Sequence, residues 1–262
     1  MIEILIAVAA VTAVGLVAGI LLAVISHFFA VEDDPKYKAV RECLPGVNCG
    51  ACGYKGCDDY AAALAAGEAK PNLCIPGGND TTQSIGAVLG IEAHAQERRV
   101  AFVHCNGNCK VTTKRVNYDG ISTCRAATMF YGGPDSCLHG CTGLGDCAAA
   151  CPVGAICMKD GIAHVNAEAC LGCGLCEDTC PRHLITMISP KSKFAVICNN
   201  KDKGATARKV CQSACIGCKK CERLCPEQAI TVTNNLARID HSKCKSCGLC
   251  EGNCPTGALK RL

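Results

Sequence analysis

The chain has 262 residues, 27 cysteines and a formal net charge of +4, with no tryptophan and 4% aromatic residues. So few large side chains exclude an ordinary hydrophobic core, and cross-links or metals must supply the stability that packing does not. The charge sum treats every cysteine as neutral, so it gives no argument for nucleic acid, and we expect no nucleic-acid partner.

The first predicted element is an uncharged apolar segment at residues 4–26, ILIAVAAVTAVGLVAGILLAVIS. At about 1.5 Å per residue, a helix of this length crosses a hydrocarbon core of roughly 30 Å. A cleaved signal peptide is the alternative, but no basic residue precedes the segment and SHFFAV is a poor cleavage site. Lys36, Lys38 and Arg41 follow the segment. The positive-inside rule therefore predicts a single-pass anchor in the cell membrane, at residues 1–30, with the bulk of the chain in the cytoplasm.

This location decides how the cysteines are used. Cytoplasmic thiols stay reduced, and an odd number of cysteines cannot pair fully within one chain. We therefore expect metal or cluster ligation and not a disulfide framework.

Residues 31–80 carry Cys49-x2-Cys52-x4-Cys57, followed by Cys74. The spacing predicts one 4Fe-4S cluster with four local ligands, and the interleaved glycines let backbone amides approach the sulfurs. The alanine-rich stretch after Cys57 predicts a helix that ends near Gly67. A zinc ion is the alternative that this spacing leaves open. The following residues, 81–135, predict a small connecting domain with a strand within AQERRVAFVHC and no assignable motif.

Four cysteine runs, each ending in Cys-Pro, occupy two predicted ferredoxin modules at residues 136–190 and 191–262. The runs are Cys137-x3-Cys141-x5-Cys147-x3-Cys151, Cys170-x2-Cys173-x2-Cys176-x3-Cys180, Cys215-x2-Cys218-x2-Cys221-x3-Cys225 and Cys244-x2-Cys247-x2-Cys250-x3-Cys254. In bacterial ferredoxins the first three cysteines of a run bind one cluster, and the fourth binds the other cluster of the pair. Paired zinc knuckles do not explain this pattern.

Pairing neighbouring runs predicts four ligand sets. They are Cys137, Cys141, Cys147 with Cys180; Cys170, Cys173, Cys176 with Cys151; Cys215, Cys218, Cys221 with Cys254; and Cys244, Cys247, Cys250 with Cys225. The stretched spacing of the first run makes its set the weakest of the four. With the N-terminal site, the sequence predicts five 4Fe-4S clusters.

The segments AICMKDGIAHV and AITVTNNLARI each predict a strand, a tight turn and a second strand. Such a hairpin is typical of each ferredoxin-like unit. The predicted fold class is therefore α+β, with one transmembrane helix, a small helical cluster domain and two tandem two-cluster modules.

Seven cysteines remain: Cys43, Cys105, Cys109, Cys124, Cys157, Cys198 and Cys211. We expect Cys157 to be a small buried hydrophobe in its strand and Cys43 to be a bystander. The other five leave two interpretations open. They are buried packing residues, or they include ligands of a sixth cluster, which requires residues 100–135 to fold back onto residues 195–211.

The apolar N-terminus, the segment LPGVNCGACGYKGCDDYAAALAAGEAKPNLC and the tandem ferredoxin runs together resemble the B-subunit family of the Rnf complex. Rnf is a membrane-bound, ion-translocating ferredoxin:NAD+ oxidoreductase. The likeness covers nearly the whole chain, and four runs match the longer form found in anaerobic bacteria. It implies that the chain takes electrons from soluble ferredoxin and relays them to membrane, flavin and NAD-binding subunits, which reduce NAD+ and move Na+ or H+.

We expect no catalytic residue on this chain, because no GxGxxG after a strand, no P-loop and no Ser/His/Asp set is found. Two other functions stay open: a polyferredoxin subunit of another membrane complex, such as a hydrogenase, and a zinc-stapled membrane adaptor. Residues 182–223 hold ten basic and two acidic side chains. This stretch is either a docking face for an acidic ferredoxin or compensation for the cluster charge.

Overall fold

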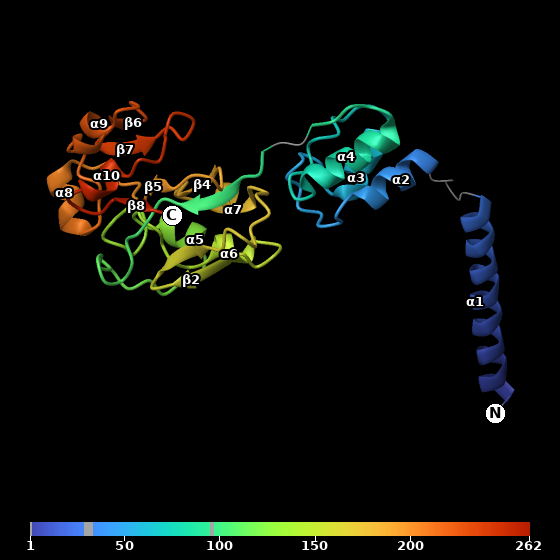
Figure 1. Cartoon of the computed structure of the whole chain (residues 1–262). Coiled ribbons are helices and arrows are strands. Elements are labelled where there is room, and N and C mark those ends of the chain that lie inside the picture. The colour runs from blue at the N-terminus through green and yellow to red at the C-terminus, as the bar shows by residue number, and fades with distance from the viewer. Residues whose placement is uncertain (1, 29–33, 95–96) are drawn as a thin grey trace.

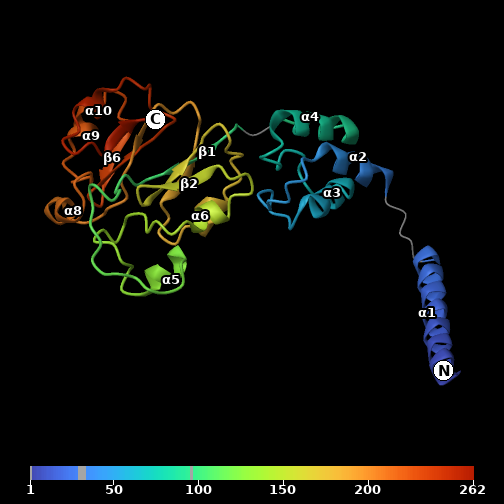
Figure 2. The same cartoon turned by 90° about the horizontal axis from the view of Figure 1, so that it is seen from below.

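The computed structural model describes residues 2–28, 34–94 and 97–262, with the side chains of the first helix described only in part. In both views the chain falls into three parts that follow one another in sequence order (Figures 1 and 2). They are the helix α1, a helical body of α2 to α4, and a larger part that holds all the described strands.

The first part is α1 (Ile2–Phe28). The predicted membrane span at residues 4–26 coincides with this helix, but it lies partly outside the described residues, which omit the side chains of residues 5, 7–11 and 26. Among the helices that the described residues form, none is both long enough and apolar enough to cross a bilayer.

The second part is the predicted small helical domain, made of α2 (Pro35–Cys43), α3 (Cys57–Ala65) and α4 (Gly78–Leu89). The carboxylate of Asp34 caps α2 by accepting a hydrogen bond from the Lys36 amide at 2.9 Å, which satisfies one of the free N–H groups at the helix start. Apolar side chains from all three helices form the core of this domain: Val40, Tyr60, Ala61, Leu64 and Ile85.

The third part contains the two predicted hairpins. They are β2 (Ile156–Lys159) with β3 (Ile162–Val165), and β6 (Ile230–Thr233) with β7 (Leu236–Ile239). The second hairpin turns through two residues with positive φ, Asn234 and Asn235, as a two-residue hairpin turn with a matching twist requires. Both hairpins are thus confirmed.

Two further strand pairs join the start and the end of each ferredoxin module. β1 (Val100–Val103) pairs antiparallel with β4 (Ile185–Ile188), and β5 (Phe194–Val196) pairs antiparallel with β8 (Leu259–Arg261). β1 lies in the region expected to be a connecting domain, yet it shares a sheet with the last strand of the first module. The residues between β1 and the first cysteine run are therefore an insertion within that module.

The two modules repeat one order of elements: a strand, a short helix, a hairpin, a short helix and a strand. The short helices are α6 (Asp146–Ala149) and α7 (Leu175–Thr179) in the first module, and α9 (Lys220–Leu224) and α10 (Leu249–Gly252) in the second. Each module carries one more helix before its first short helix: α5 (Cys124–Met129) and α8 (Gly204–Val210).

The insertion of the first module folds back onto the second module. Thr112 and Cys211 form an isolated antiparallel bridge, and the Thr112 hydroxyl donates to the Val210 carbonyl at 2.8 Å. The Gln212 amide donates to the Val111 carbonyl at 2.9 Å. These contacts meet the condition that the sequence set for a sixth cluster.

Candidate metal centres

Thiol group 1 consists of the four cysteines expected to form the N-terminal site, Cys49, Cys52, Cys57 and Cys74. Burial raises the pKa of Cys74, and the nearby thiols of the other three raise it further. α3 begins at Cys57, whose amide donates to the Asn48 side-chain oxygen at 2.8 Å. Gly50 and Gly53 have φ of 72° and 88°, so the loop that carries the first two thiols turns through positions that favour glycine.

Thiol groups 4 and 5 lie in the second module. Group 4 is Cys215, Cys218, Cys221 and Cys254, and group 5 is Cys225, Cys244, Cys247 and Cys250. The four thiols of each group line one cavity. Each group combines three cysteines of one run with the last cysteine of the other run, as the ferredoxin spacing predicts.

Thiol group 2 consists of Cys151, Cys170, Cys173 and Cys176, in the first module. Burial raises the pKa of Cys173, and the nearby thiols of Cys151 and Cys170 raise it further. The nearby thiol of Cys49, from group 1, also raises the pKa of Cys173. Groups 1 and 2 are therefore neighbours, although they belong to different domains.

Thiol group 3 differs from the set that the sequence predicted. Its cavity is lined by Cys141, Cys147, Cys180 and, in place of Cys137, by Cys124. Burial raises the pKa of Cys147 to about 12, with further contributions from the thiols of Cys141, Cys124 and Cys180. The amide of Cys124 donates to the Asp146 carboxylate at 2.8 Å, which holds the start of α5 beside the start of α6.

The sequence itself contains a signal that Cys124 takes the place of Cys137 in group 3. Cys141 and Cys147 lie six positions apart, as do Cys215 and Cys221 in the second module. The first run is therefore an ordinary run whose middle cysteine is replaced by Leu144, and it is not a stretched one. The insertion supplies the missing thiol from Cys124, and Cys137 lies outside the run.

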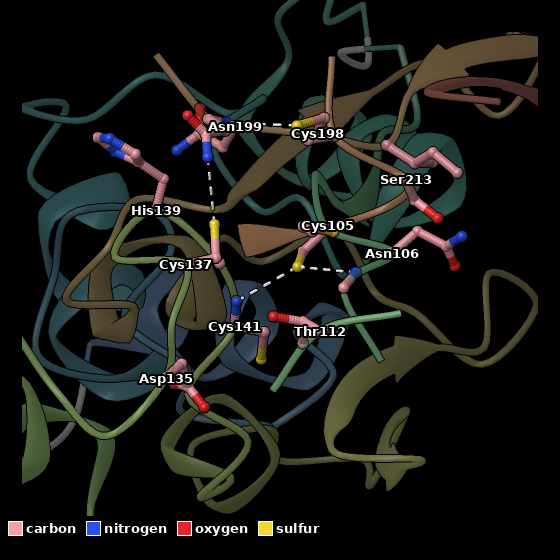
Figure 3. A pocket seen from close by; sticks show the side chains of 16 residues that line it. Cys105, Asn106, Thr112, Asp135, Cys137, His139, Cys141, Cys198, Asn199 and Ser213 are labelled. Atoms are coloured by element: carbon pink, nitrogen blue, oxygen red, sulfur yellow. Dashed lines mark hydrogen bonds between the residues drawn. The ribbon is translucent and has the colours of Figure 1, made fainter. Parts of the chain in front are cut away.

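Cys137 lies instead with three cysteines that the runs leave over, and we call Cys105, Cys137, Cys198 and Cys211 the central thiol group. These four line one pocket, together with the backbone of the Cys141 segment. In Figure 3 the sulfurs of Cys105, Cys137 and Cys198 face a common space, and the sulfur of Cys141 points away from it. Arg182 holds Cys137 in this place, because its guanidinium donates to the carbonyls of Cys137 and Gly140.

Of the other leftover cysteines, Cys157 contradicts its expectation. It is exposed, because the alternation of side chains in β2 turns it to the solvent side while its neighbour Ile156 is buried. Cys109 is also exposed. Cys43 donates to the Ala39 carbonyl at 3.3 Å and packs on the core of the helical domain.

The surroundings of the thiol groups suit iron–sulfur clusters. Backbone amides approach sulfur in several groups: Ala155 at Cys151 (3.2 Å), Leu184 at Cys180 (3.5 Å) and Ala229 at Cys225 (3.4 Å). Such hydrogen bonds stabilise thiolates and tune the cluster potential. Burial raises the pKa of Cys105 to about 12. A buried thiol of this kind becomes a thiolate only beside strong positive charge, which iron supplies.

Within the described part of the chain, no three His, Cys, Asp or Glu side chains are placed to hold a metal ion. A single zinc ion draws its thiolates to about 2.3 Å. A four-iron cluster is a larger body with one ligand at each iron. The arrangement of four thiols around one cavity fits such a body.

Three protein-family models match the chain. One, described as "Putative Fe-S cluster", matches residues 44–76, and two described as "4Fe-4S dicluster domain" match residues 214–258 and 169–230. The first range contains thiol group 1. The second range covers both cysteine runs of the second module. The third range spans the last run of the first module and the first run of the second module.

Curated relatives match nearly the whole chain. The B subunit of the Na(+)-translocating ferredoxin:NAD(+) oxidoreductase complex of Acetobacterium woodii is 41% identical over 232 residues, which cover 88% of this chain and 70% of the relative. The B subunit of the proton-translocating ferredoxin:NAD(+) oxidoreductase complex of Clostridium ljungdahlii is 40% identical, over 96% of this chain and 90% of the relative. The B subunit of an ion-translocating oxidoreductase complex of Methanosarcina acetivorans is 39% identical, over 97% of this chain and 96% of the relative.

Proposed function

The chain belongs to the B-subunit family of ion-translocating ferredoxin:NAD+ oxidoreductases, and we propose that it relays electrons from reduced ferredoxin to the other subunits of such a complex. The observation that carries this proposal is the placement of the cysteine groups: groups 1, 2 and 3 lie beside one another in that order, and groups 4 and 5 share one core in the second module. The chain contributes electron transfer, and the transformation of NAD+ belongs to its partners.

Thiol groups 1 to 5 each hold one 4Fe-4S cluster. When bound, a cluster supplies a centre that accepts and donates single electrons. The chain's residues supply the four thiolates, the amide hydrogen bonds to sulfur and the exclusion of water. Cys124 takes the place of Cys137 as a ligand in group 3.

The neighbours of each group support one order of transfer. The Cys49 thiol of group 1 is near enough to raise the pKa of Cys173 in group 2. The Cys176 thiol of group 2 raises the pKa of Cys147 in group 3 in the same way. In the second module, the thiols of groups 4 and 5 pack against one shared core. Electrons enter at the second module and leave from group 1, which is the group nearest the N-terminal helix in the chain.

The N-terminal helix places the group 1 end of the relay at the membrane. Residues 4–26 anchor the chain in the cell membrane as a single span, with the remainder in the cytoplasm beside the membrane, flavin and NAD-binding subunits. Support comes from the 27-residue helix α1 and from the basic residues that follow it. The domains are the anchor at residues 1–30, the group 1 domain from residue 31 to the end of α4 at Leu89, a first module at 100–190 that includes the insertion, and a second module at 191–262.

Soluble ferredoxin docks on the second module near thiol group 4. Cys218 is exposed there, and the exposed side chains of Lys219 and Lys220 follow it directly. Positive charge beside an exposed ligand attracts an acidic donor to the place where its electron must enter. Arg182, from the same basic stretch, is buried and contributes nothing to such a face.

Replacement of Cys52 by alanine tests the direction of the relay. In the assembled complex, ferredoxin should still reduce the clusters of the two modules, measured by EPR, while NAD+ reduction stops. NAD+ reduction at the normal rate would contradict the exit role of group 1. The adaptor alternative is tested on the same preparation, because a colourless, zinc-loaded protein would contradict any redox function.

A further inference from the structure

The central thiol group is built from matching positions of the two modules. In the first module, the end of β1 continues as Val103-His104-Cys105-Asn106, and in the second the end of β5 continues as Val196-Ile197-Cys198-Asn199. Cys137 precedes Cys141 by four positions, and Cys211 precedes Cys215 by four. Each module therefore contributes one cysteine after its first strand and one before its first cluster run.

The hydrogen bonds around these cysteines repeat in the same way. Cys105 accepts from the Cys141 amide at 3.3 Å and from the Gly107 amide at 3.4 Å. Cys198 accepts from the Cys215 amide at 3.2 Å and from the Asn200 amide at 3.4 Å. Equivalent sulfurs of the two modules thus accept hydrogen bonds from equivalent backbone amides. Leftover packing cysteines have no reason to share such a pattern.

The space between the four sulfurs is kept free of side chains. A Cβ atom at Gly140 would lie 3.5 Å from the Cys137 sulfur and 3.6 Å from the Cys105 sulfur. A Cβ atom at Gly107 would lie 3.5 Å from the Cys105 sulfur and 3.6 Å from the Cys211 sulfur. Two glycines therefore line the gaps between neighbouring thiols. The fourth sulfur, of Cys198, lies across this space from Cys137 and Cys105 (Figure 3).

The charges around the group favour an anion. A cluster held by four thiolates carries a net charge of about −2 when oxidised. Arg238 donates to the Cys198 carbonyl at 3.0 Å and to the Asn199 side chain. The Arg238 side chain is half-buried. A buried cation without a carboxylate partner is costly unless another anion lies near it.

A second guanidinium, that of Arg182, lies beside the Cys137 segment of the group. It donates to the carbonyls of Cys137 and Gly140 and lies 3.6 Å from the Asp135 carboxylate. Both side chains are nearly fully buried, and one Asp135 oxygen has no hydrogen-bond donor among the described residues. Asp202, which pairs with His139 of the same pocket, is 40% exposed, so the buried charges beside the thiols are two guanidiniums and one carboxylate.

We propose that Cys105, Cys137, Cys198 and Cys211 bind a sixth 4Fe-4S cluster, which bridges the two modules. The inference rests on the proposed function for its redox role, but the site itself is argued from these four thiols and their surroundings. One electron enters the site from group 4 and one leaves it to group 3, so the site is unchanged after each transfer.

The position of the site explains why the relay needs it. One of its sulfurs accepts a hydrogen bond from the amide of Cys141, a member of group 3, and another accepts from the amide of Cys215, a member of group 4. The site therefore touches the backbone of one proposed ligand on each side. Without it, the described residues place no thiol group between the two modules.

Iron and acid-labile sulfide, counted in the full-length chain purified anaerobically, test the proposal. Six clusters of four irons give roughly 24 irons per chain. Cys105→Ala and Cys198→Ala should each lose about four irons and four sulfides. The double variant should lose no more than either single variant, because both residues bind one cluster. Cys109→Ala is the matched control, since this exposed thiol lies in the same segment as Cys105.

Several outcomes would overturn the proposal: about 20 irons in the wild type, unchanged iron in the single variants, or one zinc in place of four irons. Loss of about eight irons in the double variant would also overturn it, because the two thiols would then serve different clusters. EPR spin counts after reduction distinguish the loss of one cluster from misfolding, since the other five clusters should remain in every variant. If the iron counts match these expectations but the wild-type chain does not accept electrons from ferredoxin, the sixth cluster site is supported and the proposed relay function is contradicted.

Discussion

At the scale of single residues, Tyr60 shows how one side chain fixes the position of a thiol. It is buried in the helical domain, where its hydroxyl donates to the Lys70 carbonyl at 2.7 Å and accepts from the Leu73 amide at 3.2 Å. Burial raises the pKa of this phenol to about 12, so the donating hydroxyl stays protonated. The side chain thereby ties the core of α3 to the loop that leads to Cys74.

Tyr60→Phe should therefore lower the free energy of unfolding of this domain by about 1–3 kcal/mol, because two backbone groups lose a buried partner. The measurement is the urea midpoint at which thiol group 1 releases its iron. Tyr131→Phe serves as the control, since that side chain is 92% exposed. Equal midpoints for the two variants would show that the hydroxyl does not hold the loop.

Cys124 is the residue on which the assignment of group 3 depends. Cys124→Ala should remove about four irons, because the thiol completes a run whose middle position is Leu144. Adding Leu144→Cys to this variant should restore them, since the second module has a cysteine at the matching position, 218. Full iron content in Cys124→Ala would mean that the thiol is not a ligand.

At the scale of elements, the two modules depend on a close approach between each cysteine run and its hairpin. A Cβ atom at Gly217 would lie 2.8–3.1 Å from backbone atoms of Asn235 in the turn of the β6–β7 hairpin. Gly143 makes the same approach to the carbonyl of Gly161 in the first module. The run and the hairpin turn therefore pack backbone against backbone in both modules.

Gly217→Ala should destabilise the second module more than Gly257→Ala does. The two glycines have similar φ, +63° and +65°, so both substitutions carry the left-handed strain of about 1–2 kcal/mol. Only Gly217 would also clash with backbone, since nothing lies within 4 Å of a Cβ atom at Gly257. Iron release in urea measures the difference, and identical curves would rule out the proposed packing.

The elements also show what sequence spacing could predict. The thiols of groups 4 and 5 each line one cavity in the combination that the spacing predicted, because each set comes from two paired runs of one module. The ligand sets of groups 1 and 2 stay predictions from the spacing. Group 3 could not be assigned by spacing, because one of its thiols comes from the insertion. The central thiol group joins residues up to 106 positions apart, from Cys105 to Cys211, which spacing within one run cannot connect.

The sequence repeat between the two modules predicts more about the leftover cysteines than the spacing within one run does. The repeated Val-x-Cys-Asn after the first strand marks Cys105 and Cys198 as equivalent, and the equal spacing of the runs separates Cys137 from its neighbours. The outward position of Cys157 follows from strand alternation. Which residues the insertion brings to which module depends on tertiary contacts such as the Thr112–Cys211 bridge.

At the scale of the whole molecule, charge should determine how fast the donor binds. Reversal of Lys219 and Lys220 to glutamate should slow the oxidation of reduced ferredoxin by about tenfold at low salt and weaken the salt dependence. Stopped-flow measurement over a range of salt concentrations tests this. Lys55→Glu with Lys159→Glu is the matched control, because it makes the same change in net charge at positions far from Cys218 in the chain. Equal rates for the two variants would place the docking face elsewhere.

The relay proposed above needs an unbroken path from the second module through the central thiol group to the first module and group 1. The most direct test mixes reduced ferredoxin with the Cys105→Ala/Cys198→Ala variant and counts the reduced clusters by rapid-freeze EPR. We predict that electrons stop after about two of the five remaining clusters, those of groups 4 and 5, while the wild type passes them on to group 1. Reduction of all five remaining clusters at the wild-type rate would contradict this path.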